Sequence, residues 1–330
     1  MGAFKNFLMN LPEVKPPAQK HLSFKEKLKW TIICLVAFFV LSNIPLYGLD
    51  PAKTIQFEQL ALILAASIGT LMTLGIGPIV TASIIMQLLN GSGLLKFDLS
   101  THEGKQLFQG SQKFAAIIMI LVESAIMVWL GGLTAQAGMS SLIIIFQLMI
   151  GGVIVMGMDE IVQKWGFGSG ISLFIVAGVA TELIVRAFSP LSTSGVWAFG
   201  SGQAPVGKVW VLIISLISRN PGEAVLAFSA IVATLVVLGM AVYAQAMKVE
   251  IPLSFGRIRG HGIRWPLKFL YTSNIPVILV AALLANIQLW AKVLESAGKP
   301  ILGSFSGGVP VSGIVSWLFA PQLVEKLLAG

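Results

Sequence analysis

Charged side chains are scarce in this chain of 330 residues. They make up 11% of the sequence, whereas 56% of the residues are hydrophobic. A soluble globular domain carries roughly 25% charged residues, so the composition excludes that class of protein and indicates a chain that folds in lipid.

Residue types that perform chemistry are also few. The single cysteine, Cys34, excludes disulfides and cysteine-based metal sites. The three histidines, His21, His102 and His261, fall outside the long apolar segments, so no histidine-based catalytic or metal site is predicted inside the membrane. The sequence has no Gly-Lys-Ser/Thr phosphate-binding loop. We therefore predict a protein that is not an enzyme and that uses no metal and no cofactor.

Apolar runs recur along the whole chain instead. A helix needs about 20 residues to cross the hydrocarbon core of a bilayer. We predict seven such spans, approximately Trp30–Tyr47, Gly75–Leu89, Phe114–Leu133, Leu142–Met158, Ile171–Ala187, Val225–Met247 and Phe269–Ala291.

The basic residues are distributed unevenly over the connecting segments. With a cytoplasmic N-terminus, fifteen of the 22 lysines and arginines fall on the cytoplasmic side. The positive-inside rule therefore predicts a multi-pass protein with its N-terminus in the cytoplasm.

The apolar sequence from Phe57 to Leu89 is too long for one span. As a single helix it would extend about 50 Å, against a hydrocarbon core of about 30 Å. Four breakers, Gly69, Gly75, Gly77 and Pro78, interrupt it, which predicts a short re-entrant helix over Phe57–Ile68 followed by a second element. Irregular backbone at this depth requires protein or a water-filled cavity around it. A kinked, tilted span is the alternative interpretation.

Glu123 is the one clearly intramembrane ionisable residue, near the middle of the third predicted span. Carboxylates in lipid are costly and often functional. Two interpretations stay open here, a protonated side chain hydrogen-bonded to its neighbours and a group that couples transport to protons.

The segment from Lys248 to Lys268 carries a concentration of positive charge. Arg257, Arg259, Arg264 and Lys268 lie among glycines, with only Glu250 as an opposing charge. Such a segment can act as an orientation signal that contacts anionic lipid, or as a dock for a polyanion such as ribosomal RNA.

Several motifs resemble one known family in the same order along the chain. Ile68–Leu89 is similar to the second helix of SecY-type protein-conducting channels, and Gly168–Ile175 to the start of their fifth. Val249–Leu253 with Gly256–Gly260 resembles the loop between the sixth and seventh helices, and Ser273–Leu279 the seventh helix. The Lys-Val-Glu-Ile-Pro-Leu wording is similar to archaeal and eukaryotic members, which implies an archaeal cell membrane.

The resemblance implies an all-α membrane protein, a polytopic helical bundle with two inverted repeats of five helices. Only the first seven transmembrane helices and a re-entrant plug helix, at about 57–68, are expected here. Helices eight to ten are missing, so a fragment that forms no sealed pore by itself is expected. The expected divisions are an N-terminal half (1–187), an external linker with an interfacial segment (188–224) and an incomplete C-terminal half (225–330).

The resemblance also implies the functional residues. The apolar pore ring is expected at Ile76, Val80, Ile171, Ile175 and Ile278. The polar cluster of the lateral gate is expected at Thr81, Glu123 and Asn286. The docking loop for the ribosome is expected at Arg257, Arg259, Arg264 and Lys268. From the residues alone, ordinary packing in a bundle is the preferred interpretation of the five ring positions.

The function that the resemblance implies is translocation of secretory polypeptides across the membrane and lateral insertion of membrane proteins. A docked partner such as the ribosome would supply the energy. The implied partners are the SecE/gamma subunit, a small beta subunit, the ribosome with its RNA and proteins, signal sequences and nascent chains, and membrane lipids. A secondary transporter, which also uses broken helices, and a membrane scaffold are the competing classes.

Overall fold

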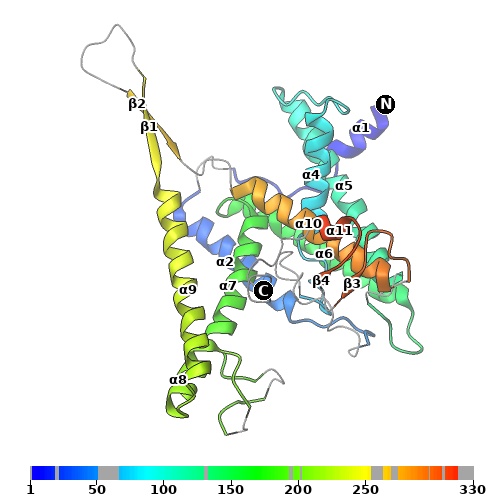
Figure 1. Ribbon diagram of the computed structural model, residues 1–330. Coiled ribbons are helices and arrows are strands. Elements are labelled where there is room, and N and C mark those ends of the chain that lie inside the picture. Colours follow the sequence, from blue (N-terminus) through cyan, green and yellow to red (C-terminus); the bar gives the residue numbers. More distant parts are fainter. Residues whose placement is uncertain are drawn as a thin grey trace. The chain divides into compact units, whose positions relative to one another are not determined.

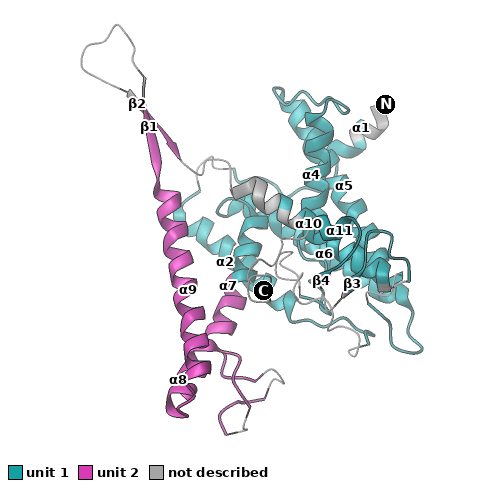
Figure 2. Cartoon of the chain, in the orientation of Figure 1, with its two compact units in different colours: residues 1–179, 279–330 teal, residues 180–278 magenta. Residues whose placement is uncertain are grey.

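The fold is described from a computed structural model. The described residues are 2–18, 22–50, 67–129, 133–192, 196–200, 203–253, 263–268, 274–296, 298–306 and 309–318. Within these ranges the chain is helical, with two small two-stranded antiparallel sheets (Figure 1). It forms two compact units, residues 1–179 with 279–330 and residues 180–278 (Figure 2).

The first unit holds most of the helices. They are α1 (Gly2–Met9), α2 (Phe24–Ser42), α4 (Gly77–Gly91), α5 (His102–Trp129), α6 (Ser141–Trp165), the first part of α7 (Gly170–Phe188), most of α10 (Asn274–Ser296) and α11 (Ile314–Leu318). A small sheet of β3 (Phe305–Ser306) and β4 (Val309–Pro310) also belongs to this unit.

Each of the seven predicted spans falls on one of the helices. Among the described residues, α5, α6, α7 and α9 (Pro221–Ala246) are long and apolar enough to cross a membrane. Predicted bounds differ from the observed ones by several residues at α2 and α6, and the largest difference is at α5, which begins at His102 rather than near Phe114. Its first turns are polar, so hydropathy assigned them to a loop although they continue the helix.

Local sequence signals explain where the helices begin. Ser23 accepts a hydrogen bond from the backbone of Glu26, and Glu26 reaches back to Ser23, so a capping box starts α2. At α4 the chain turns through Gly75 with a φ of 53°, a conformation that favours glycine, and Pro78 occupies the first turn. The predicted interruption at these residues is confirmed. The predicted plug helix lies almost wholly outside the described residues.

The core of the first unit is a continuous apolar cluster. Phe38 of α2 stacks on Phe174 of α7 with ring centroids 5.0 Å apart. Glycines let helices approach closely: a Cβ at Gly152 of α6 would lie 2.8 Å from Ile120 Cγ2 of α5. Close packing of small against branched residues is typical of helix interfaces in membranes.

The corner between α6 and α7 is closed by a buried carboxylate. Asp159 is 6% exposed, and its Oδ1 accepts a hydrogen bond of 2.9 Å from the backbone N–H of Ile171. Gln163 donates to Oδ2 of the same group at 2.7 Å. The carboxylate therefore satisfies a donor in the first turn of α7, as a helix cap does.

An ion-pair network holds the N-terminal segment against α5 and α6. Glu160 lies 2.7 Å from Lys113 Nζ and 3.0 Å from Lys164 Nζ, and it accepts a hydrogen bond from the backbone of Val14 at 3.1 Å. Lys164 also pairs with Glu13 and donates to the Val14 carbonyl. One carboxylate therefore joins three segments of the chain.

This network leads to a first prediction. Glu160→Ala removes the acceptor of the Val14 amide and one partner of each lysine. Because the contacts of Lys164 with Glu13 and the Val14 carbonyl remain, we expect more frequent local opening at Val14 and not detachment of the whole segment. Amide hydrogen exchange at Val14 should become at least about tenfold faster, corresponding to a loss of about 1.4 kcal/mol. Lys5→Ala is the control, because the Lys5–Glu103 pair is exposed and such pairs contribute little. Unchanged exchange in a folded Glu160→Ala variant would contradict the prediction.

The second unit consists of a helical pair and a β-hairpin. Its elements are the C-terminal part of α7, α8 (Lys208–Ile217), α9, β1 (Lys248–Leu253) and β2 (Ile263–Lys268). α8 coincides with the short apolar run expected in the linker, and it packs against α9. The sequence analysis treated 248–268 as a basic, glycine-containing loop and did not predict the hairpin, whose strands carry prolines at 252 and 266.

Candidate functional site

Three buried polar residues meet inside the first unit, where the sequence predicted a polar cluster. Thr81 of α4, Glu123 of α5 and Asn286 of α10 are 3%, 1% and 2% exposed. Asn286 Nδ2 donates to Thr81 Oγ1 at 2.6 Å and lies 3.3 Å from Glu123 Oε1. Thr81 Oγ1 in turn donates to the Gly77 carbonyl at 2.9 Å. The structure therefore brings all three predicted residues together.

The hydrogen bonding of this polar cluster is incomplete. Asn286 Oδ1 is buried and accepts no hydrogen bond from any of the described residues. A buried acceptor without a partner costs about 1–3 kcal/mol. The Asn286 amide thus joins α4, α5 and α10 through its nitrogen, while its oxygen has no hydrogen-bond partner among the described residues.

The four described members of the predicted pore ring share one apolar environment. Ile76 and Val80, at the start of α4, are 0% exposed and belong to the core cluster. Ile171 and Ile175 of α7 are partly buried and pack against the same cluster. The side chain of Ile278 lies outside the described residues. Ile76 and Val80 are close in sequence to Thr81, so apolar ring and polar cluster share α4.

The predicted docking loop is partly described, and its described part is the β-hairpin. In the register of β1 and β2, Lys248 lies directly opposite Lys268 and Pro252 opposite Arg264. Glu250 Oε2 lies 3.2 Å from Arg264 Nη1 and its Oε1 lies 3.8 Å from Lys248 Nζ. Arg257 and Arg259 lie outside the described residues.

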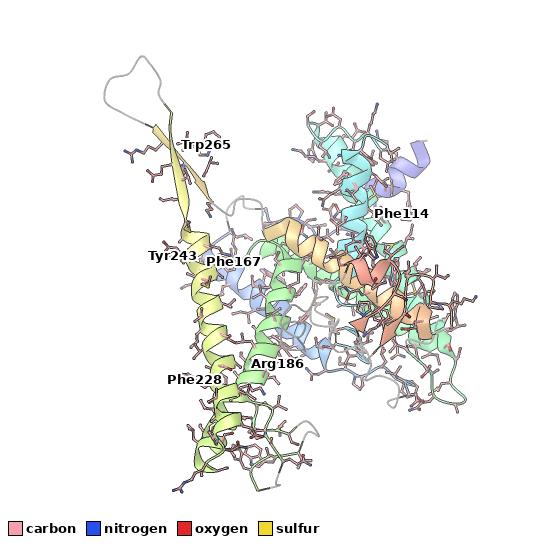
Figure 3. All side chains as sticks on the ribbon, in the orientation of Figure 1. Phe114, Phe167, Arg186, Phe228, Tyr243 and Trp265 are labelled. Atoms are coloured by element: carbon pink, nitrogen blue, oxygen red, sulfur yellow. The ribbon has the colours of Figure 1, made fainter. Side chains whose placement is uncertain are left out.

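The hairpin exposes its side chains on both faces. Arg264 and Lys248 are 70% and 59% exposed along their side chains. Trp265 is 59% exposed and extends from the hairpin in Figure 3. Like charges directly opposite each other destabilise a strand pair. Repulsion between Lys248 and Lys268 thus destabilises the strand pair locally, and a bound anion would reduce this repulsion.

The sequence analysis missed the roles of two residues of the first unit, Asp159 and Gly77. Asp159 sits at the end of an apolar helix and looks like an ordinary interfacial residue, so nothing in the sequence indicated its role as a cap for α7. Gly77 was interpreted only as a helix breaker. Its closeness to Asn286, far away in the sequence, could be found only from the fold.

Comparison with known families identifies the chain at this point. The SecY family matches residues 70–327, which is more than half of the sequence. The chain belongs to the SecY family. The segment before it, residues 36–69, matches the plug domain of Sec61p. This segment contains Phe57–Ile68, where the re-entrant helix was predicted.

Archaeal relatives agree over nearly the whole chain. The protein translocase subunit SecY of Methanothermobacter thermautotrophicus is 45% identical over 329 residues, covering 98% of this chain and 71% of the relative. The SecY subunit of Methanocaldococcus jannaschii is 46% identical over 322 residues, covering 98% and 70%. The chain thus spans about 70% of the length of these SecY proteins.

Solved structures match the fold as well. A protein-conducting channel superposes with a TM-score of 0.78 at 45% identity, covering 94% of this chain and 67% of the other. The channel of the canine ribosome–channel complex from the endoplasmic reticulum gives 0.77, also at 45% identity, covering 94% and 68%. The chain is therefore a helical membrane protein with the SecY channel fold. It is a SecY-type subunit for protein transport and not an enzyme.

Proposed function

We propose that this SecY subunit supplies the plug, one wall of the lateral gate and most of the pore ring of a protein-conducting channel. Secretory polypeptides cross through it, and membrane proteins leave it sideways into lipid. The observation that carries the proposal is the buried hydrogen-bonded contact of Asn286 with Thr81 and Glu123, which ties α10 to α4 and α5. A gate needs a specific contact of this kind that can be broken.

The polar cluster would hold the gate closed by a small free-energy difference. Its hydrogen bonds stabilise the packed state, while the unpartnered oxygen of Asn286 favours an opened state in which water or a polypeptide reaches it. A hydrophobic signal sequence that replaces α10 against α4 would shift this balance. The hydrophobicity required of a signal would then depend on these three side chains.

The pore ring would act as a seal that makes no specific bond to its cargo. Ile76, Val80, Ile171 and Ile175 are stiff, β-branched apolar residues. A constriction lined by such side chains excludes water and ions when it is narrow. Ile278 is proposed as the fifth member.

Partner proteins would supply the driving force for translocation and the remaining subunits of the complex. We propose that the docking loop binds the ribosome, which drives chain transfer, and that a SecE/gamma subunit and a small beta subunit complete the complex. A solved relative is the channel of a ribosome complex, which supports this choice. The archaeal relatives and the excess of basic residues support a cell membrane location with the N-terminus in the cytoplasm.

Crosslinking separates this proposal from a secondary transporter. A stalled nascent secretory chain carrying a photoreactive residue should crosslink to the full-length subunit, reconstituted with its partner subunits, at ring positions such as Ile76. A transporter predicts accumulation of a small solute in vesicles and no such crosslink. The absence of crosslinks from a stalled, ribosome-bound chain would overturn the channel proposal.

The plug assignment gives a second prediction. Replacing Phe57–Ile68 with a Gly/Ser linker of equal length should leave the ring as the only seal, so the reconstituted complex should show intermittent ion conductance in planar bilayers. Replacing residues 193–203 in the same way is the matched control and should remain closed. Currents equal to those of the intact channel would remove the plug assignment.

A further inference from the structure

Gly77 occupies a special place beside the polar cluster. A Cβ added to this residue would lie 2.9 Å from Asn286 Oδ1 and 3.2 Å from Asn286 Nδ2. The carbonyl of the same residue accepts the hydrogen bond of Thr81. The amide of Asn286 therefore lies against bare backbone, in a space that exists only because residue 77 has no side chain.

We propose that Gly77 is a positioning residue that sets the opening threshold of the gate. Its missing side chain allows the Asn286 amide to reach Thr81 Oγ1 at 2.6 Å. Any side chain at residue 77 displaces the amide and breaks this bond. This inference rests on the gating function proposed for the polar cluster.

The kind of neighbour distinguishes Gly77 from the glycines that serve packing. At Gly151 of α6 an added Cβ would collide with the backbone carbonyl of Leu71, and at Gly170 it would lie 2.6 Å from the Cα of Asp159. Those substitutions require backbone movement. At Gly77 the atoms in the way form the tip of one side chain, which can rotate. Substitution there should therefore alter the hydrogen bond and leave the fold intact.

The sign of the effect follows from which state loses the hydrogen bond. In the packed state the displaced Asn286 amide no longer bonds to Thr81 while it remains buried. In an opened state the amide is free to bond elsewhere, so the added methyl group has no neighbour to displace. Gly77→Ala therefore destabilises the closed gate selectively, and less hydrophobic signal sequences should open it.

The test is a signal-hydrophobicity titration in the full-length channel with its partner subunits. Gly77→Ala should increase export through a weakly hydrophobic signal by roughly fivefold, the equivalent of one net hydrogen bond. The control is Gly91→Ala at the other end of α4, where an added Cβ meets nothing within 4 Å. Export with a strong signal reports whether each variant assembles.

A double-variant cycle separates positioning from a general loss of packing. In the Asn286→Ala background no amide remains to be displaced, so adding Gly77→Ala should leave the threshold where Asn286→Ala alone sets it. An equal effect of Gly77→Ala in both backgrounds would overturn the proposal. The proposal would also fail if the single variant Asn286→Leu shifts the opening threshold and the single variant Gly77→Ala leaves it at the wild-type value. If neither variant shifts the threshold, the gating function itself fails.

Discussion

Asn286→Leu is expected to raise the hydrophobicity that a signal sequence needs to open the channel. Leucine has the same branched outline as asparagine, and it removes the buried Oδ1 that has no partner among the described residues. Leucine also loses the hydrogen bonds to Thr81, at 2.6 Å, and to Glu123, at 3.3 Å. Thr81 keeps its hydrogen bond to the Gly77 carbonyl, and an apolar side chain at residue 286 meets water or a polypeptide only in the opened state, so we expect the packed state to gain on balance. Replacing an incompletely bonded polar group in this way stabilises the packed state.

The expected shift is large enough to measure. Removing an unsatisfied acceptor contributes about 1–3 kcal/mol, which the two lost hydrogen bonds partly offset, so export through a weak signal should fall by up to about tenfold. Asn43→Leu is the matched control: Asn43 is exposed at the end of α2, and its side chain donates to the Phe39 carbonyl of its own helix. An unchanged or lowered threshold in a correctly inserted Asn286→Leu channel would contradict the mechanism.

Charge reversal in the docking loop is expected to have the second large effect, on ribosome affinity. The Arg257→Glu, Arg259→Glu double variant removes two basic groups from a loop whose stem already holds Lys248, Arg264 and Lys268 around a single Glu250. For each phosphate that the variant no longer neutralises, the dependence of log affinity on log salt should flatten by about 0.7–0.9. Affinity and salt slope should therefore fall together.

Co-sedimentation of ribosomes with the solubilised channel complex across a salt series measures both quantities. Lys208→Glu with Lys299→Glu makes the same change in net charge on the side predicted to face away from the ribosome, and it should leave affinity and slope unchanged. Wild-type affinity and slope in a correctly inserted double variant would show that the loop acts only as an orientation signal. A decrease equal to that of the control pair would indicate a general charge effect.

Hydropathy and breaker residues predicted the helices well, because both signals are local. The run of Gly75, Gly77 and Pro78 indicated the start of α4, and each predicted span overlaps a helix. The polar start of α5 and the β-hairpin were missed. In both, a long-range or register-dependent arrangement stabilises residues whose composition alone suggests a loop.

The polar cluster was predictable only through family resemblance. Glu123 stood out by itself as an intramembrane carboxylate, but Thr81 and Asn286 are ordinary residues for membrane helices. What composition could not supply is that α10 returns from the far end of the sequence to place Asn286 within 2.6 Å of Thr81. The same holds for Gly77, whose significance depends on that return.

The capped corner between α6 and α7 couples the start of α7 to the end of α6. Asp159 is hydrogen-bonded to the first turn of α7, and the backbones at this corner are so close that a Cβ at Gly170 would lie only 2.6 Å from the Cα of Asp159. We expect a displacement of Ile171 to move the end of α6 as well. Glu160 and Lys164 follow Asp159 by one and five residues, and both form hydrogen bonds with the backbone of Val14 in the N-terminal segment. We therefore expect a probe attached beside Val14 to report displacements that begin at the proposed pore ring.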